Sequence, residues 1–255
     1  MPPRIAIPMP HSADREYAER AIPQYERAVT LAGGEPVRIP LDQAPAEVAM
    51  MIERCDGVLL PGSNADIDPA RFKAPRSSHT AAADPRRDAV DDQLLADAYQ
   101  KRKPVLGICY GLQSLNVFRA GSLIQHIPDF LPEAARVKVD HEAGKNVAVA
   151  HTVEIDPDSK LAGIVTPEIR GPRSDARRPL VVPVNSSHHQ SAEAIGTGLR
   201  IVARCPDDNI IEALEGTSPD HFVIAVQWHP ERSVDQDEPS RAIFRALIEA
   251  ASKRA

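Results

Sequence analysis

The stretch that decides the fold reads Pro104-Val105-Leu106-Gly107-Ile108-Cys109-Tyr110-Gly111. Its apolar residues predict a buried strand, and a helical pattern follows directly over residues 112–120. A thiol between two glycines at a strand-to-helix turn is typical of a nucleophile elbow, because the strained turn leaves little room for Cβ atoms. Backbone N–H groups and the helix dipole at such a turn favour the reactive thiolate. We therefore predict that Cys109 is a nucleophile, although free cysteines also occur as small buried hydrophobes.

A second apolar run, residues 222–228, leads directly into His229-Pro230-Glu231. A thiol nucleophile needs a base to take and return its proton, and the base needs a group that orients it. His229 is the predicted base, and Glu231 is the predicted carboxylate that sets its tautomer. Pro230 stiffens the backbone between them. An elbow cysteine and a strand-end His-x-Glu together predict a catalytic Cys-His-Glu set.

The first hundred residues predict alternating strands and helices. Strands are expected at 4–8, 36–39, 57–60 and 104–108, and helices at 15–32, 45–54 and 84–102. This order predicts an α/β fold, a doubly wound and mostly parallel central sheet with helices on both faces. Ligands bind beyond the carboxyl ends of the strands in such sheets. The Pro61-Gly62 turn, Cys109 and His229 are therefore expected at one edge.

The second half of the chain predicts short strands. They are expected at 122–124, 136–139, 147–155, 180–184, 199–203 and 210–214, before residues 222–228 rejoin the sheet and residues 239–251 close the chain as a helix. We interpret them as a strand-rich insertion. No linker separates two cores, so residues 1–255 are expected to form a single domain. Residues 63–83 are a long polar loop, and such loops are usually functional or disordered.

Composition excludes several function classes. The formal net charge of −6 argues against nucleic acid as a main partner. No apolar stretch is long enough for a membrane span, and no signal peptide is visible at the amino terminus. Three cysteines, an odd number, do not suggest a disulfide framework, and Cys55 and Cys205 lack the elbow context. These features predict a cytoplasmic protein without a cofactor, and they leave a homodimer open.

Four motifs resemble a known family. They are Leu59-Leu60-Pro61-Gly62-Ser63, Gly107-Ile108-Cys109-Tyr110-Gly111-Leu112-Gln113, Val184-Asn185-Ser186-Ser187-His188-His189-Gln190 and Gln227-Trp228-His229-Pro230-Glu231, with weaker echoes at residues 84–88 and 211–213. The chain resembles the class I glutamine amidotransferase superfamily of Cys-His-Glu enzymes. Within it, the chain is similar to the γ-glutamyl-γ-aminobutyrate hydrolase branch. The resemblance implies a flavodoxin-like class I glutaminase fold.

Thiolate attack on an amide gives an oxyanion and then a thioester, and the oxyanion needs preorganised N–H donors. The backbone N–H of Tyr110, next to the nucleophile, is one expected donor. The resemblance assigns the second donor to the last residue of a turn that is commonly Pro-Gly-Gly in the superfamily. That residue is Ser63 here, so its backbone must hold the required conformation with a Cβ present.

Further residues are candidates for substrate binding. The resemblance implies Gly62 in the oxyanion turn and Gln113 at the glutamyl end, although Gln113 could instead brace the elbow. Asn185, His188, His189 and Gln190 follow an apolar run and could line the cleft. Arg87 and Asp88 could meet the carboxylate and amine of a γ-glutamyl compound, or simply be solvated. We predict no metal at His188-His189, because adjacent histidines in a strand point apart and no Cys or carboxylate sits at suitable local spacing.

The resulting hypothesis is a hydrolase that cleaves the γ-amide of a small γ-glutamyl compound through a Cys109 thioester. The resemblance makes γ-glutamyl-γ-aminobutyrate the expected substrate. One alternative is a glutaminase subunit that delivers ammonia to a synthase partner. Another is a binding protein on the same fold without catalysis, since fold alone does not prove activity. The Arg170-to-Pro179 run carries no function that we can assign.

Overall fold

The computed structural model describes residues 1–136, 139–145, 147–166 and 179–254. Its centre is a nine-stranded sheet with the order β2-β1-β3-β4-β11-β10-β9-β6-β7. The strands are β1 (Arg4–Pro8), β2 (Glu35–Ile39), β3 (Gly57–Leu60), β4 (Val105–Ile108), β6 (His151–Ile155), β7 (Leu180–Val184), β9 (Leu199–Arg204), β10 (Ile211–Gly216) and β11 (Val223–Val226). All pairs from β2 to β11 are parallel, whereas the pairs from β11 to β7 are antiparallel. The predicted doubly wound α/β sheet is confirmed.

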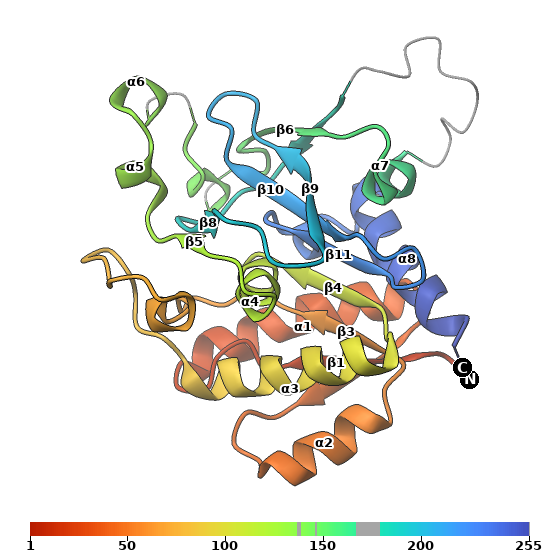
Figure 1. The fold of residues 1–255 in the computed structure, drawn as a ribbon. Helices are drawn as coiled ribbons and strands as arrows, with labels where there is room; N and C mark the ends of the chain where they lie inside the picture. The colour runs from red at the N-terminus through yellow and green to blue at the C-terminus, as the bar shows by residue number, and fades with distance from the viewer. Residues whose placement is uncertain (137–138, 146, 167–178, 255) are drawn as a thin grey trace.

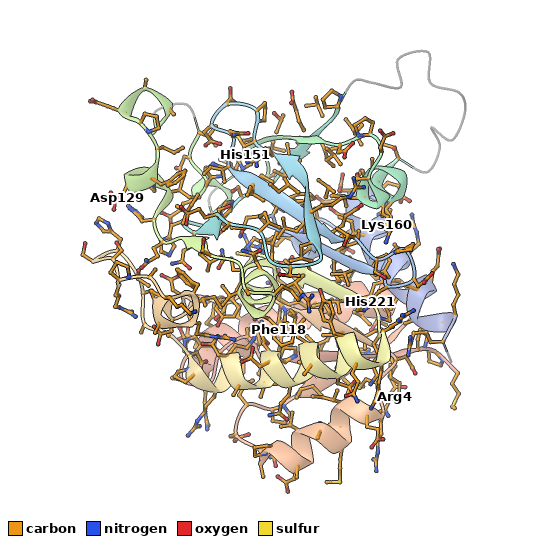
Figure 2. The ribbon with its side chains drawn as sticks, viewed as in Figure 1. Arg4, Phe118, Asp129, His151, Lys160 and His221 are labelled. Carbon is orange, nitrogen blue, oxygen red and sulfur yellow. The ribbon has the colours of Figure 1, made fainter. Side chains whose placement is uncertain are left out.

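Helices cover both faces of this sheet (Figure 1). One apolar core gathers side chains from α1 (Arg15–Leu31), α7 (Lys160–Val165) and α8 (Glu238–Ser252). The other gathers side chains from α2 (Pro45–Glu53), α3 (Pro85–Lys101) and α4 (Tyr110–Phe118). The strands alternate between the two cores, so Leu59 enters the first and Leu60 the second. Phe118, the last residue of α4, is labelled in Figure 2, and its ring centroid lies 5.9 Å from that of Tyr99 in α3.

The strands of the second half extend the same sheet, so the predicted insertion is an antiparallel continuation of it. Strand prediction for residues 136–139 was wrong at its start, because Arg136 ends the short helix α6 (Glu133–Arg136), and residues 137–138 lie outside the described residues. The predicted strand 147–155 begins only at His151. The remaining elements are short: η1 (Pro69–Phe72), β5 (Leu123–Ile124), α5 (Ile127–Phe130), η2 (Ala143–Lys145), β8 (Ser191–Ala192) and η4 (Pro230–Arg232). We keep a single domain over residues 1–255 as a proposal, supported by the continuous sheet.

Parallel strand register brings the predicted site together. β4 lies between β3 and β11, with Leu60 opposite Gly107 and Val226 opposite Ile108. The three strands therefore end at the same edge, and the segments that carry the turn, the thiol and the imidazole leave the sheet side by side. In the described parts of the chain, every helix is too short or too polar to cross a membrane.

Candidate active site

Cys109 occupies a strained turn between β4 and α4. Its backbone has φ 53° and ψ −107°, a conformation that side-chain-bearing residues rarely adopt. Its N–H donates to the carbonyl of Val226 at 2.8 Å, which ties the turn to β11. A Cβ on Gly107 would lie 2.8 Å from the carbonyl oxygen of Gly111, and one on Gly111 would lie 2.2 Å from the carbonyl oxygen of Leu60. Both glycines are therefore required by close backbone approach.

His229 lies next to Cys109, and Gly62 lies close to both residues. A Cβ placed on Gly62 would be 3.1 Å from His229 Cε1 and 3.7 Å from Cys109 Cβ. The structure thus brings a thiol and an imidazole to one point from segments that are 120 positions apart in the sequence. Because Gly62 has no side chain, the His229 ring can approach the turn closely.

Glu231 holds one side of the imidazole. Its Oε1 lies 2.8 Å from His229 Nδ1, and both side chains are buried. The other ring nitrogen, Nε2, has no hydrogen bond partner among the described residues and is left for the thiol. Burial opposes a charged imidazole, but the nearby Glu231 carboxylate and Cys109 sulfur outweigh it and raise the pKa of His229 to about 9. Glu231 is buried too, yet His229 lowers the pKa of its carboxyl.

Two backbone N–H groups are candidate oxyanion donors, those of Tyr110 and Ser63. Tyr110 opens α4, where the first N–H groups have no intrahelical acceptor. The N–H of Gly62 is used, because it donates to the Tyr25 hydroxyl at 3.0 Å. Ser63 is not among the described non-glycine residues with positive φ, so its Cβ causes no backbone strain. The departure from Pro-Gly-Gly is therefore compatible with a second donor at Ser63.

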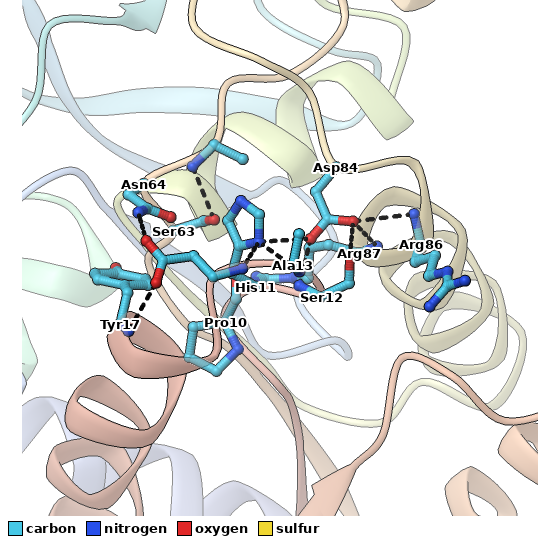
Figure 3. A network of polar contacts seen from close by, with 12 residues as sticks. Pro10, His11, Ser12, Ala13, Tyr17, Ser63, Asn64, Asp84, Arg86 and Arg87 are labelled. Atoms are coloured by element: carbon cyan, nitrogen blue, oxygen red, sulfur yellow. Dashed lines mark hydrogen bonds and ion pairs between the residues drawn. The ribbon is translucent and has the colours of Figure 1, made fainter.

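A polar network holds the turn that contains Ser63 (Figure 3). The Ser63 hydroxyl accepts from the N–H of Ala65 at 3.1 Å. The next residue, Asn64, donates to the Asp14 carboxylate at 2.7 Å, and Asp14 also caps α1. Beside it, Asp84 accepts from the N–H and hydroxyl of Ser12 at 2.6 and 2.7 Å while capping α3. The carboxyl-end loops are thus fixed to the starts of two helices.

A cavity of about 320 Å³ opens over the sulfur. The predicted residues that line it are Ser63, Cys109, Tyr110, Gln113, His188, His189, Gln190 and His229. Four predicted site residues do not line it: Gly62, Arg87, Asn185 and Glu231. Gly62 and Glu231 lie directly behind the lining, whereas the other two have different roles.

Arg87 is a structural residue in this fold. Its guanidinium is fully buried and donates to Asp91 at 2.7 Å, to the Pro61 carbonyl at 2.7 Å and to the Pro10 carbonyl at 3.1 Å. Asp88 accepts from the Tyr110 hydroxyl at 2.6 Å and pairs with Arg71. The structure therefore places this predicted pair under the elbow and away from substrate.

Asn185 clamps the backbone of His229. Its amide donates to the His229 carbonyl at 2.9 Å and accepts from the His229 N–H at 2.8 Å. Gln113 is also engaged, because its amide nitrogen lies 3.2 Å from the Gln190 carbonyl and 3.3 Å from Gln227 Oε1. Both amides position the walls of the site. For Gln113 this is the bracing role that the sequence left open.

His188 and His189 point to different partners. His188 Nδ1 lies 2.9 Å from the Gln190 carbonyl, and its Nε2 faces Glu212 at 3.5 Å. His189 Nε2 lies 3.0 Å from Asp66 Oδ1 at the cavity wall. Adjacent histidines thus separate, one toward the interior and one toward the cavity.

The sequence did not reveal several cavity residues, chiefly Tyr17, Asn64, Asp66, Glu142 and Arg232. Burial, with Cys109 and Glu231 nearby, raises the pKa of Tyr17 to about 12 and keeps its hydroxyl neutral. Tyr17 was hidden on the apolar face of α1, where an aromatic residue looks like ordinary core. Arg232 offered a usable signal, since it directly follows the predicted catalytic carboxylate.

Residues 5–231 match the profile of the family described as Peptidase C26. The chain belongs to this family. A Mycobacterium tuberculosis protein, provisionally named a glutamine amidotransferase, is 37% identical to this C26 chain over 89% of its length, and the chain spans 66% of that relative. The γ-glutamyl-γ-aminobutyrate hydrolase of Escherichia coli O157:H7 is 30% identical, with 97% of the chain and 93% of the relative covered.

A solved structure supports the fold of the C26 chain. It is that of a Thermoplasma acidophilum protein provisionally named as part of a GMP synthase, and it has a TM-score of 0.61 at 14% identity. All of this chain and 96% of that chain are covered. This similarity shows a class I glutamine amidotransferase fold. The family match and the relatives place the chain among glutamine amidotransferase-like hydrolases.

Proposed function

We propose that this chain is a cysteine-dependent hydrolase that cleaves the γ-glutamyl amide bond of a small γ-glutamyl compound. The observation that carries the proposal is the meeting of Cys109, His229 and Glu231 at the carboxyl edge of the sheet. The strained φ of Cys109 and the 2.8 Å contact between His229 and Glu231 are features that a passive buried cysteine does not need. A reducing cytoplasm suits a working thiol and is the location that we propose.

The chemistry follows from the charges at the site. A pKa of about 9 keeps His229 protonated at neutral pH, and an imidazolium stabilises a neighbouring thiolate. The Cys109 sulfur attacks the γ-carbonyl carbon, and the N–H groups of Tyr110 and Ser63 receive the oxyanion. His229 gives its proton to the departing amine as the carbon–nitrogen bond breaks. It then takes a proton from water, which adds to the thioester and releases glutamate and the thiolate.

Arg232 supplies a cation at the cavity, and its Nε lies 3.6 Å from Glu231 Oε1. It lines the cavity and keeps about a third of its side chain exposed. A guanidinium binds a carboxylate through paired hydrogen bonds. Asp66, on the same cavity and paired with His189, offers a negative charge for an α-amino group. We propose these groups for the recognition role that the sequence assigned to Arg87 and Asp88.

The proposed substrate is γ-glutamyl-γ-aminobutyrate. The support is the similarity over almost the whole chain to hydrolases named for that compound, at about 30% identity. Other relatives carry only an amidotransferase name. The identity of the amine therefore has to be settled by assay.

The deciding assay measures glutamate released from γ-glutamyl-γ-aminobutyrate, glutamine and other γ-glutamyl amides. We expect the first compound to be cleaved fastest, with a glutamyl adduct on Cys109 visible by mass spectrometry in the acid-quenched reaction. Cys109→Ala should abolish both signals. Cys55→Ala is the matched control, because burial raises the pKa of that thiol to about 11 and it lies away from the cavity.

Two outcomes would replace the proposal. Cleavage of glutamine alone, and only after a synthase is added, would identify a glutaminase subunit. A folded protein that cleaves none of these amides and forms no adduct would identify a binding protein on the same fold.

A further inference from the structure

A second group of buried polar side chains lies behind the cavity wall. His141, His151, His188 and Glu212 each present one atom to a common point, and these four atoms all lie within 4.8 Å of one another. Their side chains are at most 3% exposed. His151 begins β6 and Glu212 lies in β10, in the antiparallel half of the sheet, where Figure 2 labels His151. The group is assembled from four separate segments.

The distances from Glu212 match three edges of a small tetrahedron. Glu212 Oε1 is 3.2 Å from His141 Nδ1, 3.4 Å from His151 Nε2 and 3.5 Å from His188 Nε2. Ligand atoms bound to zinc at about 2.0–2.1 Å in tetrahedral geometry lie roughly 3.3–3.4 Å apart. The three edges from Glu212 Oε1 bracket that value, and the three ring nitrogens lie within 4.8 Å of one another.

Each imidazole is held by its other nitrogen. His141 Nε2 lies 2.8 Å from Asp208 Oδ2, His151 Nδ1 lies 3.0 Å from the Thr152 carbonyl, and His188 Nδ1 contacts the Gln190 carbonyl. All three partners are acceptors, so the proton of each neutral ring resides on that outer nitrogen. The inner nitrogens then present lone pairs to the shared point. Metal-bound histidines are oriented in this way by carboxylates and carbonyls.

The inner atoms have no other partners. Apart from these contacts with one another, His141 Nδ1, His151 Nε2, His188 Nε2 and both Glu212 oxygens lack a hydrogen bond partner within the described parts of the chain. A buried polar atom without a partner costs on the order of 1–3 kcal/mol, and a buried charge costs more. A divalent cation would satisfy the three imidazole nitrogens and Glu212 Oε1, and it would neutralise the buried carboxylate.

We propose that His141, His151, His188 and Glu212 bind one Zn²⁺ in a closed tetrahedral site. Three imidazoles and one carboxylate form a donor set suited to zinc, and four protein ligands leave no open position for catalysis. The site is therefore structural. This proposal is independent of the proposed hydrolase function, and it departs from the expectation of no metal.

A cation at this site would also fix the position of one wall of the active-site cavity. His188 is also a cavity residue, and His189 and Gln190 follow it in the cavity lining. Asn185, three positions before His188, clamps His229. A cation held by His188 would anchor this whole segment to β6 and β10 and so keep the wall in place.

The test measures metal content in the full chain purified without a polyhistidine tag. Elemental mass spectrometry should find about one zinc per chain in the wild type. Cys109→Ala should retain it, which separates this site from adventitious thiolate binding in the cavity. Glu212→Gln and His151→Asn should each lose most of it. His79→Asn should leave the zinc content unchanged. His79, His126 and Asp129 form a mostly exposed group that could also hold a metal, so zinc lost in this variant and kept in Glu212→Gln would place the ion there and overturn the proposal.

X-ray absorption on the wild type keeps the proposal testable if the ligand variants do not fold. The expected spectrum shows four nitrogen or oxygen ligands at about 2.0–2.1 Å, with imidazole scattering and no sulfur. Two further results would overturn the proposal. One is a folded wild-type chain that lacks zinc and takes up none when zinc is added. The other is zinc that disappears in Cys109→Ala or shows a sulfur ligand.

Discussion

Glu231 controls the pH range over which His229 keeps its proton. The pKa of His229 is raised, so the imidazolium is present at neutral pH and is lost as pH rises through about 9. Glu231→Gln removes the nearest negative charge, and burial then disfavours the charged ring. We expect the alkaline limb of the kcat/KM profile, near pH 9 in the wild type, to move at least one pH unit lower.

The measurement is a pH series of γ-glutamyl amide hydrolysis. Asp235→Asn is the matched control, since that carboxylate is exposed and pairs with Arg27 at the surface. An unchanged alkaline limb in Glu231→Gln would mean that the carboxylate does not stabilise the imidazolium.

Arg232 tests the proposed recognition of the substrate carboxylate. A charge-assisted hydrogen bond is worth about 1.5–3 kcal/mol, so Arg232→Ala should raise KM by roughly 10-fold or more. Because Arg232 Nε also lies 3.6 Å from Glu231 Oε1, which orients His229, we expect kcat to fall as well, but by less than KM rises. Arg232→Lys should recover part of the affinity through charge alone. The measurement is steady-state kinetics, with the exposed Arg20→Ala as control; a normal KM in Arg232→Ala would reject the role.

The role of a residue could be predicted where its neighbours in the sequence mark a catalytic motif. Cys109 and His229 follow apolar strands, and a strand end is readable from the sequence. The sequence analysis expected Arg87 to meet the substrate. Its observed partners, the carbonyls of Pro10 and Pro61, come together only when β1 and β3 pair. A charged residue at a helix start looks solvated until the tertiary structure covers it.

At the scale of elements, the elbow requires a glycine after the nucleophile. Gly111→Ala would place a Cβ 2.2 Å from the Leu60 carbonyl oxygen, which pushes α4 away from β3. We expect a loss of about 3 kcal/mol in the free energy of unfolding, measured by urea titration, together with a large fall in activity.

Gly163→Ala is the matched control in α7. A Cβ there would meet nothing within 4 Å. Alanine is the better helix former, so this change should stabilise the protein by about 0.5–1 kcal/mol. Equal effects of the two substitutions would show that the elbow is not tightly packed.

The bounds of a strand could be predicted best where the strand is buried on both faces. β3 and β4 are buried on both faces and read as continuous apolar runs, so their positions followed directly. β7 is half-exposed, and β6 begins later than its apolar run suggested. Pairing with a neighbouring strand decides where such strands begin, and pairing is not written in the local sequence.

At the scale of the whole molecule, long-range contacts decided what the sequence could not reveal. The proposed zinc site includes His141 and Glu212, which are 71 positions apart in the sequence. The folding of the antiparallel half of the sheet brings them together. Neither residue stands in a spacing typical of metal ligands. The sequence therefore revealed His188 without the partners that give it a role.

Both apolar cores cross from the parallel to the antiparallel half, so the two halves should unfold together. Val202 of β9 shares a core with Ile108 and Trp228. Val202→Ala removes two buried methyl groups and should cost about 2 kcal/mol. Trp228, the only tryptophan, reports on the active-site edge by fluorescence, while circular dichroism reports on the whole sheet. Urea transitions from both probes should coincide and shift equally, because the loss of stability is shared by one continuous core.

Val181→Ala, at a position 56% exposed on β7, should change stability by less than about 0.5 kcal/mol. A circular dichroism transition that shifts while the Trp228 transition stays in place would show that the halves unfold independently and that the chain is not a single domain.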